Sequence, residues 1–194
     1  MNFLAHIYLS GDDSQVIIGN FIADGIHGKK YTLYPWGIQK GILLHRAIDT
    51  YTDTHPIFRK STKRLHEKYS HYSGVIVDIF YDHFLAKNWN DYSNIPLEKY
   101  SASFYELIQE NIHVLPLHAQ RMVPHMVKGN WLLSYKTVQG IENVLQGMDQ
   151  RTKYNSKMNE SIHELKKYYN SFELEFTSFF EELIIFSKSK LMSL

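Results

Sequence analysis

The polar residues in the segment GILLHRAIDTYTD are spaced so that a helix would bring them to one side. His45, Asp49 and Asp53 follow one another at intervals of four residues, among apolar neighbours such as Leu44 and Ile48. Side chains four residues apart on an α-helix lie about 6 Å from each other. Imidazole and carboxylate groups together are suitable ligands for a divalent transition metal. The segment therefore indicates either a metal site or a network of buried hydrogen bonds.

The same spacing recurs in other apolar segments near the start of the chain. The pairs are Asn2 with His6, Asn20 with Asp24, and Asp78 with Asp82, which His83 follows directly. Among these segments Arg46 is the only strong cation. Several carboxylates in one apolar interior repel each other, and a divalent cation removes that repulsion. A metal site formed by inward-facing helix pairs is therefore favoured over unrelated hydrogen-bond networks.

Apolar periodicity predicts helices over nearly the whole chain. The expected ranges are 2–10, 14–27, 36–54, 57–70, 74–89, 97–112, 118–128, 130–149 and 156–187, and Pro124 could split one of them. No repeat or linker divides them, so we expect a single all-α domain, a helical bundle over residues 1–194. The last range carries an apolar stripe that we expect to lie in the core rather than to bind a cofactor. Its members are Phe172, Leu174, Phe176, Phe179, Phe180, Leu183, Ile184 and Phe186.

Composition excludes several classes of protein. The chain has no cysteine, which excludes disulfides, thiolate ligands and thiol catalysis and is typical of a reducing cytosol. A net charge of +1 gives no global electrostatic reason to expect nucleic acid. No segment reaches the roughly 20 apolar residues of a membrane span, and the start MNFLAHIYLS does not resemble a signal peptide. We therefore expect a cytoplasmic protein with neither membrane nor nucleic acid as its partner.

Several motifs, in order, resemble one known family. MNFLAH, GNFIADG, LLHRAIDTYTD and DIFYDHFL, followed by WLLSYKTVQGIENVLQGMDQR, are similar to the acyl carrier protein phosphodiesterases, from Met1 to about Arg151. The resemblance implies an all-helical, HD-domain-like fold and dependence on Mn²⁺ or another divalent cation. It also implies the removal of 4′-phosphopantetheine from the serine of holo-acyl carrier protein (holo-ACP), which leaves apo-ACP. An HD-like phosphohydrolase acting on a nucleotide or another small phosphate ester, or a non-catalytic protein that binds ACP or a metal, remains the alternative.

Ligands cannot be copied from ordinary HD domains, because this chain has no His-Asp dipeptide. With the implied reaction in view, we expect a metal site whose ligands are Asp24, His45, Asp78 and Asp82. Arg46 would stabilise the transition state, or instead form a structural salt bridge with Asp49 or Asp53. The expected general acid or base is His83 or His6, although His83 could equally be a core histidine. Asp49, Asn2 and Asn20 would orient the ligands.

A basic segment follows the proposed active-site helix. Acyl carrier proteins are acidic, so we expect a basic docking surface, for which an ordinary solvated helix face is the alternative. In FRKSTKRLHEK the basic residues are Arg59, Lys60, Lys63, Arg64 and Lys68. The sequence gives no indication of the oligomeric state.

Overall fold

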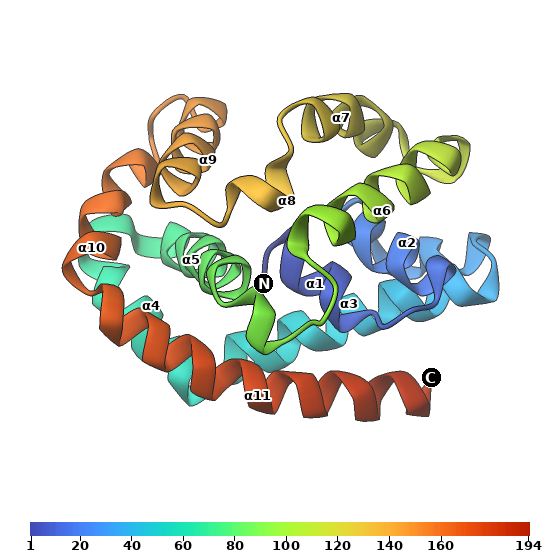
Figure 1. The fold of residues 1–194 in the computed structure, drawn as a ribbon, viewed down its shortest axis with the longest axis horizontal. Helices are drawn as coiled ribbons and strands as arrows, with labels where there is room; N and C mark the ends of the chain where they lie inside the picture. Colours follow the sequence, from blue (N-terminus) through green and yellow to red (C-terminus); the bar gives the residue numbers. More distant parts are fainter.

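The computed structural model describes residues 1–194 and is built from helices without any β-strand (Figure 1). This confirms the all-α prediction, whereas the likeness to HD domains stays a prediction. Short 3₁₀ turns, such as Ala23–Gly25 and Gly28–Leu33, connect several of the α-helices. The α-helices are α1 (Phe3–Leu9), α2 (Ser14–Ile22), α3 (Trp36–Thr54), α4 (Pro56–Tyr69), α5 (Ser73–Lys87), α6 (Leu97–Glu110), α7 (Leu117–Lys128), α8 (Trp131–Ser134), α9 (Val138–Arg151), α10 (Ile162–Lys167) and α11 (Tyr169–Ser193).

Helix boundaries follow the local capping chemistry. The predicted range 36–54 coincides with α3, and α4 begins at Pro56, where the missing N–H costs no hydrogen bond. The predicted range 130–149 is wrong as one helix, because the Thr137 side chain accepts from the Gly140 N–H and starts α9 separately from α8. The range 156–187 is also divided, at Tyr168, into α10 and α11. Pro124 lies inside α7 without ending it.

The long helix α11 crosses α3, α4 and α5 along one side of the molecule (Figure 1). Its residues Phe172, Phe176, Phe179 and Phe180 are fully buried, so the prediction that this stripe belongs to the core is confirmed. Leu174 is the exception, since it points away from the core and is 71% exposed. Helix α5 is buried between α1, α4, α9 and α11, which explains why its apolar residues surround the whole helix rather than one face.

Two glycines allow α2 and α3 to pack backbone to backbone. A Cβ atom on Gly41 would lie 2.2 Å from the carbonyl oxygen of Val16, and one on Gly19 would lie 2.1 Å from that of Ile38. Any side chain at either position would therefore push the two helices apart. This close crossing places Asn20, which follows Gly19, against His45 of α3.

The basic residues of α4 mostly face acidic residues of the C-terminal helices. Arg64 donates two hydrogen bonds, of 2.8 and 2.7 Å, to the buried Glu175 of α11. Lys60 lies 3.2 Å from the same carboxylate, and Lys68 lies 3.1 Å from Glu160 and 3.3 Å from Glu164. These contacts give three of the five basic residues a structural role. Of the other two, Arg59 donates to the backbone oxygen of Asp53 and Lys63 makes no ion pair, and carrier-protein docking here stays a prediction.

The Arg64→Ala variant is expected to lose about 3 kcal/mol of stability, because it leaves the Glu175 carboxylate buried without its bidentate partner. For a chain of this length that loss corresponds to a fall in Tm of roughly 10 °C. Lys63→Ala on the same helix is the matched control and should melt like the wild type. Thermal melts followed by circular dichroism measure both changes. The Ser61 hydroxyl also donates to Glu175. A Tm unchanged by Arg64→Ala would mean that Lys60 and Ser61 satisfy the Glu175 carboxylate without the arginine.

Candidate metal and active site

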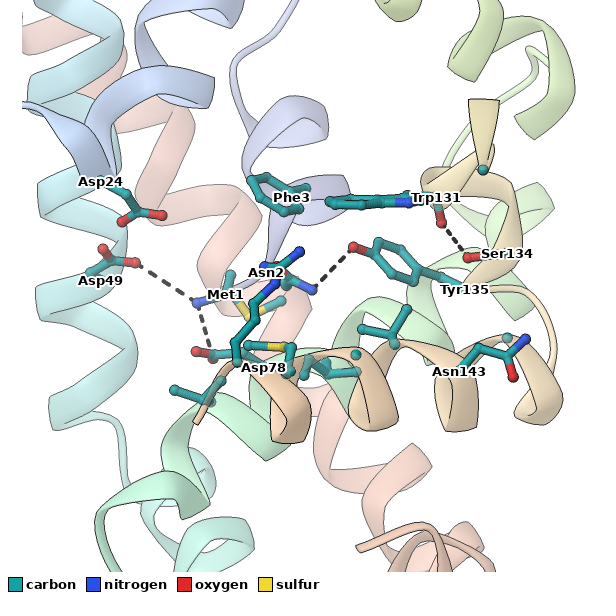
Figure 2. Close-up of a pocket in the computed structure, with 18 of the residues that line it drawn as sticks. Met1, Asn2, Phe3, Asp24, Asp49, Asp78, Trp131, Ser134, Tyr135 and Asn143 are labelled. Carbon is teal, nitrogen blue, oxygen red and sulfur yellow. Dashed lines mark hydrogen bonds and ion pairs between the residues drawn. The ribbon is translucent and has the colours of Figure 1, made fainter. Parts of the chain in front are cut away.

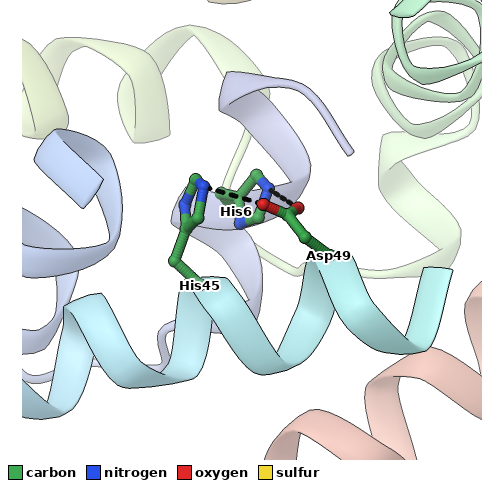
Figure 3. Close-up of side chains that lie close together, drawn as sticks. All are labelled: His6, His45 and Asp49. Atoms are coloured by element: carbon green, nitrogen blue, oxygen red, sulfur yellow. Dashed lines mark ion pairs between the residues drawn. The ribbon is translucent and has the colours of Figure 1, made fainter. Parts of the chain in front are cut away.

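Two histidines and one aspartate from two helices, α1 and α3, come together beside the core (Figure 3). His6 of α1 stacks on His45 of α3, with ring centroids 3.9 Å apart and the rings within 15° of parallel. Asp49 lies one turn after His45, and its two oxygens lie 3.2 Å from His6 Nε2 and 3.1 Å from His45 Nε2. Both rings therefore present their Nε2 atoms to the same carboxylate.

Residues from the end of α2 fix the orientation of His45. His45 Nδ1 lies 2.9 Å from the Asn20 backbone oxygen and 3.0 Å from the Asn20 side-chain oxygen, so Nδ1 carries the proton that it donates. The Asn20 amide nitrogen in turn donates to the His6 backbone oxygen and to Ser10. Asp24, on the turn after α2, lies 3.1 Å from His45 Nε2. Asn20 thus connects α2 with the backbone of α1 and with the His45 side chain on α3.

The electrostatics of the cluster give the two histidines different pKa values. Burial and the neighbouring His45 lower the pKa of His6 to about 4, although Asp49 acts in the opposite direction. Burial also opposes the charged form of His45, but hydrogen bonds with Asp24 and Asp49 outweigh it and raise its pKa to about 9. Burial opposes the charged form of Asp49 as well, yet the close contacts with both histidines hold its pKa well below the usual range. At neutral pH the anionic Asp49 carboxylate therefore faces one protonated ring, that of His45, and one neutral ring, that of His6.

This donor set fits a divalent transition metal. One ligand atom each from His6, His45 and Asp49 all lie within 4.8 Å of one another. Both ring nitrogens of His6 are buried without a hydrogen bond of acceptable geometry, which is costly unless a ligand satisfies one of them. Asp24, through its contact with His45 Nε2, is available as a second carboxylate. Mixed imidazole and carboxylate ligands are typical of such metals.

The cluster borders a pocket of about 600 Å³, a volume usual for small-molecule sites (Figure 2). The α3 residues His45, Asp49 and Asp53 lie on one wall together with Asp24. Helix α5 contributes Val75, Asp78 and Ile79, and the opposite wall comes from α8 and α9. The pocket therefore leads from the cluster toward the second half of the chain.

The two acidic residues of α5 that were expected to bind metal take other contacts. Asp78 lies 3.0 Å from the main-chain nitrogen of Met1, and burial raises its pKa to about 6 against the attraction of that nitrogen. Asp82 accepts hydrogen bonds from the N–H groups of Leu4, at 2.8 Å, and Ala5, at 3.2 Å. Asp82 therefore accepts from N–H groups in the first turn of α1, which have no acceptor within α1 itself. Asp78 remains at the pocket, whereas Asp82 acts in the positioning of α1.

Arg46 and His83 are not among the residues that line the pocket. Arg46 donates a 2.7 Å hydrogen bond to the Ile26 backbone oxygen and lies over the ring of Tyr31, not in an ion pair with Asp49 or Asp53. His83 Nδ1 lies 2.7 Å from the Tyr135 backbone oxygen, and its Nε2 lies 2.7 Å from the Tyr169 hydroxyl. His83 therefore connects α5 with the α8–α9 segment and α11, which matches its alternative reading as a core histidine.

Several pocket residues on α8 and α9 were not singled out by the sequence reasoning. On α9 the pocket residues are spaced by three or four positions, which places them on one helix face. That periodicity is present in the segment GIENVLQGMDQR, but it contains no cluster of metal-binding residue types that would have drawn attention to it. The residues of this face are Gly140, Asn143, Val144, Gly147, Met148 and Arg151.

Known proteins match nearly the whole chain. The family described as acyl carrier protein phosphodiesterase matches residues 1–183. The chain belongs to this family. Proteins named acyl carrier protein phosphodiesterase from Photorhabdus laumondii and Yersinia pestis are 28% and 29% identical to it. The alignments cover 98% and 95% of this chain, respectively, and 96% of each relative.

A third family member, from Salmonella agona, is 28% identical over 95% of this chain and 96% of its own length. No solved structure matches the chain. None of the helices has both the length and the apolar character needed to span a membrane.

Proposed function

We propose that this protein is a metal-dependent phosphodiesterase that removes 4′-phosphopantetheine from the serine of holo-ACP. Membership of the acyl carrier protein phosphodiesterase family supports the substrate and the reaction. The observation that carries the metal is the convergence of His6, His45 and Asp49 beside a pocket of about 600 Å³. The proposed ligands are these three residues, with Asp24 as a fourth.

In the proposed reaction a water oxygen forms a bond to phosphorus, and the bond between phosphorus and the serine oxygen breaks. The serine oxygen takes up a proton, so the products are apo-ACP and 4′-phosphopantetheine. A divalent cation at the cluster supplies Lewis-acid activation of the water and withdraws charge from a phosphoryl oxygen.

The residues around the cluster have separate tasks. His6, whose pKa is about 4, stays neutral at pH 7 and can offer a lone pair. Asn20 holds the His45 ring so that Nε2 faces Asp24 and Asp49. Asp78 has a pKa of about 6 and lines the pocket, so its carboxyl is suited to exchange a proton with a reacting group.

Chelation and metal addition test this function. After removal of divalent ions with EDTA, purified protein is expected to leave holo-ACP intact, and added Mn²⁺ should restore the release of 4′-phosphopantetheine. Mass spectrometry follows the loss of the prosthetic group from the carrier protein. Metal at about 100 times its Kd should also stabilise the fold by about 2.7 kcal/mol, which a thermal melt detects without any substrate.

Each outcome tests a different part of the proposal: the metal, the substrate or the catalytic activity. Turnover that persists in EDTA, with no thermal response to Mn²⁺, would remove the metal from the mechanism. Intact holo-ACP, combined with hydrolysis of a nucleotide or another small phosphate ester, would favour the alternative phosphohydrolase. Binding of Mn²⁺ with no hydrolysis of any of these compounds would favour a binding protein.

A further inference from the structure

The wall of the pocket formed by α8 and α9 differs in character from the wall formed by α3. Figure 2 shows Asp24 and Asp49 at one end of the pocket and Asn143 at the other, with Trp131 and Tyr135 above the space between them. The α8–α9 wall carries no carboxylate among its lining residues. It combines apolar side chains with the neutral polar groups of Ser134, Tyr135 and Asn143. This wall is suited to an elongated, uncharged ligand with both apolar and hydrogen-bonding groups.

The face of α9 that lines the pocket is open at its middle. Gly147 lies one turn after Asn143 and one turn before Arg151, and all three line the pocket. A Cβ atom on Gly147 would meet nothing within 4 Å, so the glycine leaves space rather than permitting a tight helix contact. Gly140, on the same face, differs because its Cβ would lie 1.8 Å from the Ser134 backbone oxygen. The space beside Gly147 therefore belongs to the pocket.

Arg151 ends the same helix face with a positive charge. It is the only lysine or arginine among the lining residues, and its guanidinium carbon lies 5.9 Å from the centre of the Trp131 ring. It forms no ion pair with any carboxylate of the chain. An unpaired guanidinium beside a pocket is suited to a phosphate group, with which it can form two parallel hydrogen bonds.

We propose that the α8–α9 wall binds the neutral pantetheine part of the substrate, along the α9 face that contains Asn143 and Gly147, with Arg151 facing the phosphate. This proposal rests on the function proposed above. A pantetheine arm has two amides and a hydroxyl for the polar groups of this wall, and a dimethyl group and methylenes for its apolar ones. The phosphate then lies at the end of the arm nearest the His6–His45–Asp49 cluster, where the diester is cut.

The space beside Gly147 provides a direct test. The Gly147→Phe variant fills it, and the matched control Gly74→Phe adds the same side chain where a Cβ also meets nothing within 4 Å, outside the pocket lining. We expect Gly147→Phe to lower the ratio of kcat/KM for holo-ACP to that for bis(p-nitrophenyl) phosphate by about tenfold or more. The small diester has no arm, so the ratio isolates arm binding from the chemistry. Gly74→Phe should keep the wild-type ratio.

Binding of free 4′-phosphopantetheine, measured by isothermal titration calorimetry, is the second readout. Wild type and Gly74→Phe should bind it, Gly147→Phe should bind it at least about tenfold more weakly, and Arg151→Ala should weaken it more than it weakens pantetheine without phosphate. An unchanged ratio and unchanged affinity in a folded Gly147→Phe protein would overturn the proposal. The wild type could bind free 4′-phosphopantetheine, and Gly147→Phe could abolish this binding, while neither protein cleaves holo-ACP. That outcome would support the arm site and reject the proposed function. Absence of binding by the wild type would overturn the arm site itself.

Discussion

The Asp49→Ala variant is expected to lose both hydrolysis of holo-ACP and the thermal response to Mn²⁺. Asp49 is the residue that His6 and His45 share, with its two oxygens 3.2 and 3.1 Å from their Nε2 atoms. Removal of a residue that only orients a ligand already lowers metal affinity about 10- to 100-fold, and loss of a ligand should cost more. Calorimetric titration with Mn²⁺ and the assay with holo-ACP measure the two effects. The variant should remain folded, since Asp49 is partly exposed and borders the pocket.

Asp53→Ala is the matched control for Asp49→Ala. It changes the same residue type on the same helix, one turn further along, but Asp53 is not part of the donor group. The affinity of Asp53→Ala for Mn²⁺ should stay within about twofold of the wild type, because the variant removes only a charge that lies outside the donor group. Equal loss of Mn²⁺ binding in both variants would show that the metal is held by the general negative charge of α3. Full Mn²⁺ binding by Asp49→Ala would place the metal elsewhere.

The Asp82→Ala variant is expected to lose stability rather than metal affinity. The change leaves the N–H groups of Leu4 and Ala5 without an acceptor in a fully buried place. Two unsatisfied N–H groups cost about 3 kcal/mol or more together, which corresponds to a fall in Tm of roughly 10 °C. Thermal melts in EDTA measure the loss. A second series of melts with Mn²⁺ should show the same upward shift as in the wild type, because the donor cluster is intact.

Asp82→Asn keeps one acceptor oxygen and provides the comparison. It should be intermediate in Tm, because the amide oxygen can still accept from one of the two N–H groups. If Asp82 is instead a metal ligand, both variants would lose the Mn²⁺-dependent shift while melting normally in EDTA. The two assignments therefore predict opposite results in the same pair of experiments.

The spacing of polar residues predicted the candidate site only in part. The interval between His45 and Asp49 is local to one helix, so periodicity was sufficient to place both on one face. The meeting of His6 with His45 depends on how α1 packs against α3, and no pattern within either segment specifies that packing. His6 was therefore expected as a proton donor, whereas its ring lies stacked on a proposed ligand.

The same limit explains Asp78 and Asp82. Their interval of four residues and their apolar surroundings are the same as those of the α3 pair. A buried carboxylate that binds a cation and one that accepts from the N–H groups of a neighbouring helix have the same sequence signature, because both are an aspartate in an apolar segment. Only the position of the α1 N-terminus distinguishes them. The fold class could be predicted without knowing how the helices pack, since the helical periodicity of each segment excluded strands.

The close crossing of α2 and α3 at Gly19 and Gly41 has a consequence for genetic screens. At both positions a hydrogen atom is the largest side chain that the opposing backbone admits. Conservative apolar replacements there should inactivate the protein as often as changes to His45 or Asp49. A screen for loss of function would therefore recover the two glycines together with the proposed metal ligands, and the phenotype alone would not separate them. The soluble yield of each mutant would separate the two groups, because only the glycine mutants are expected to lack a folded product.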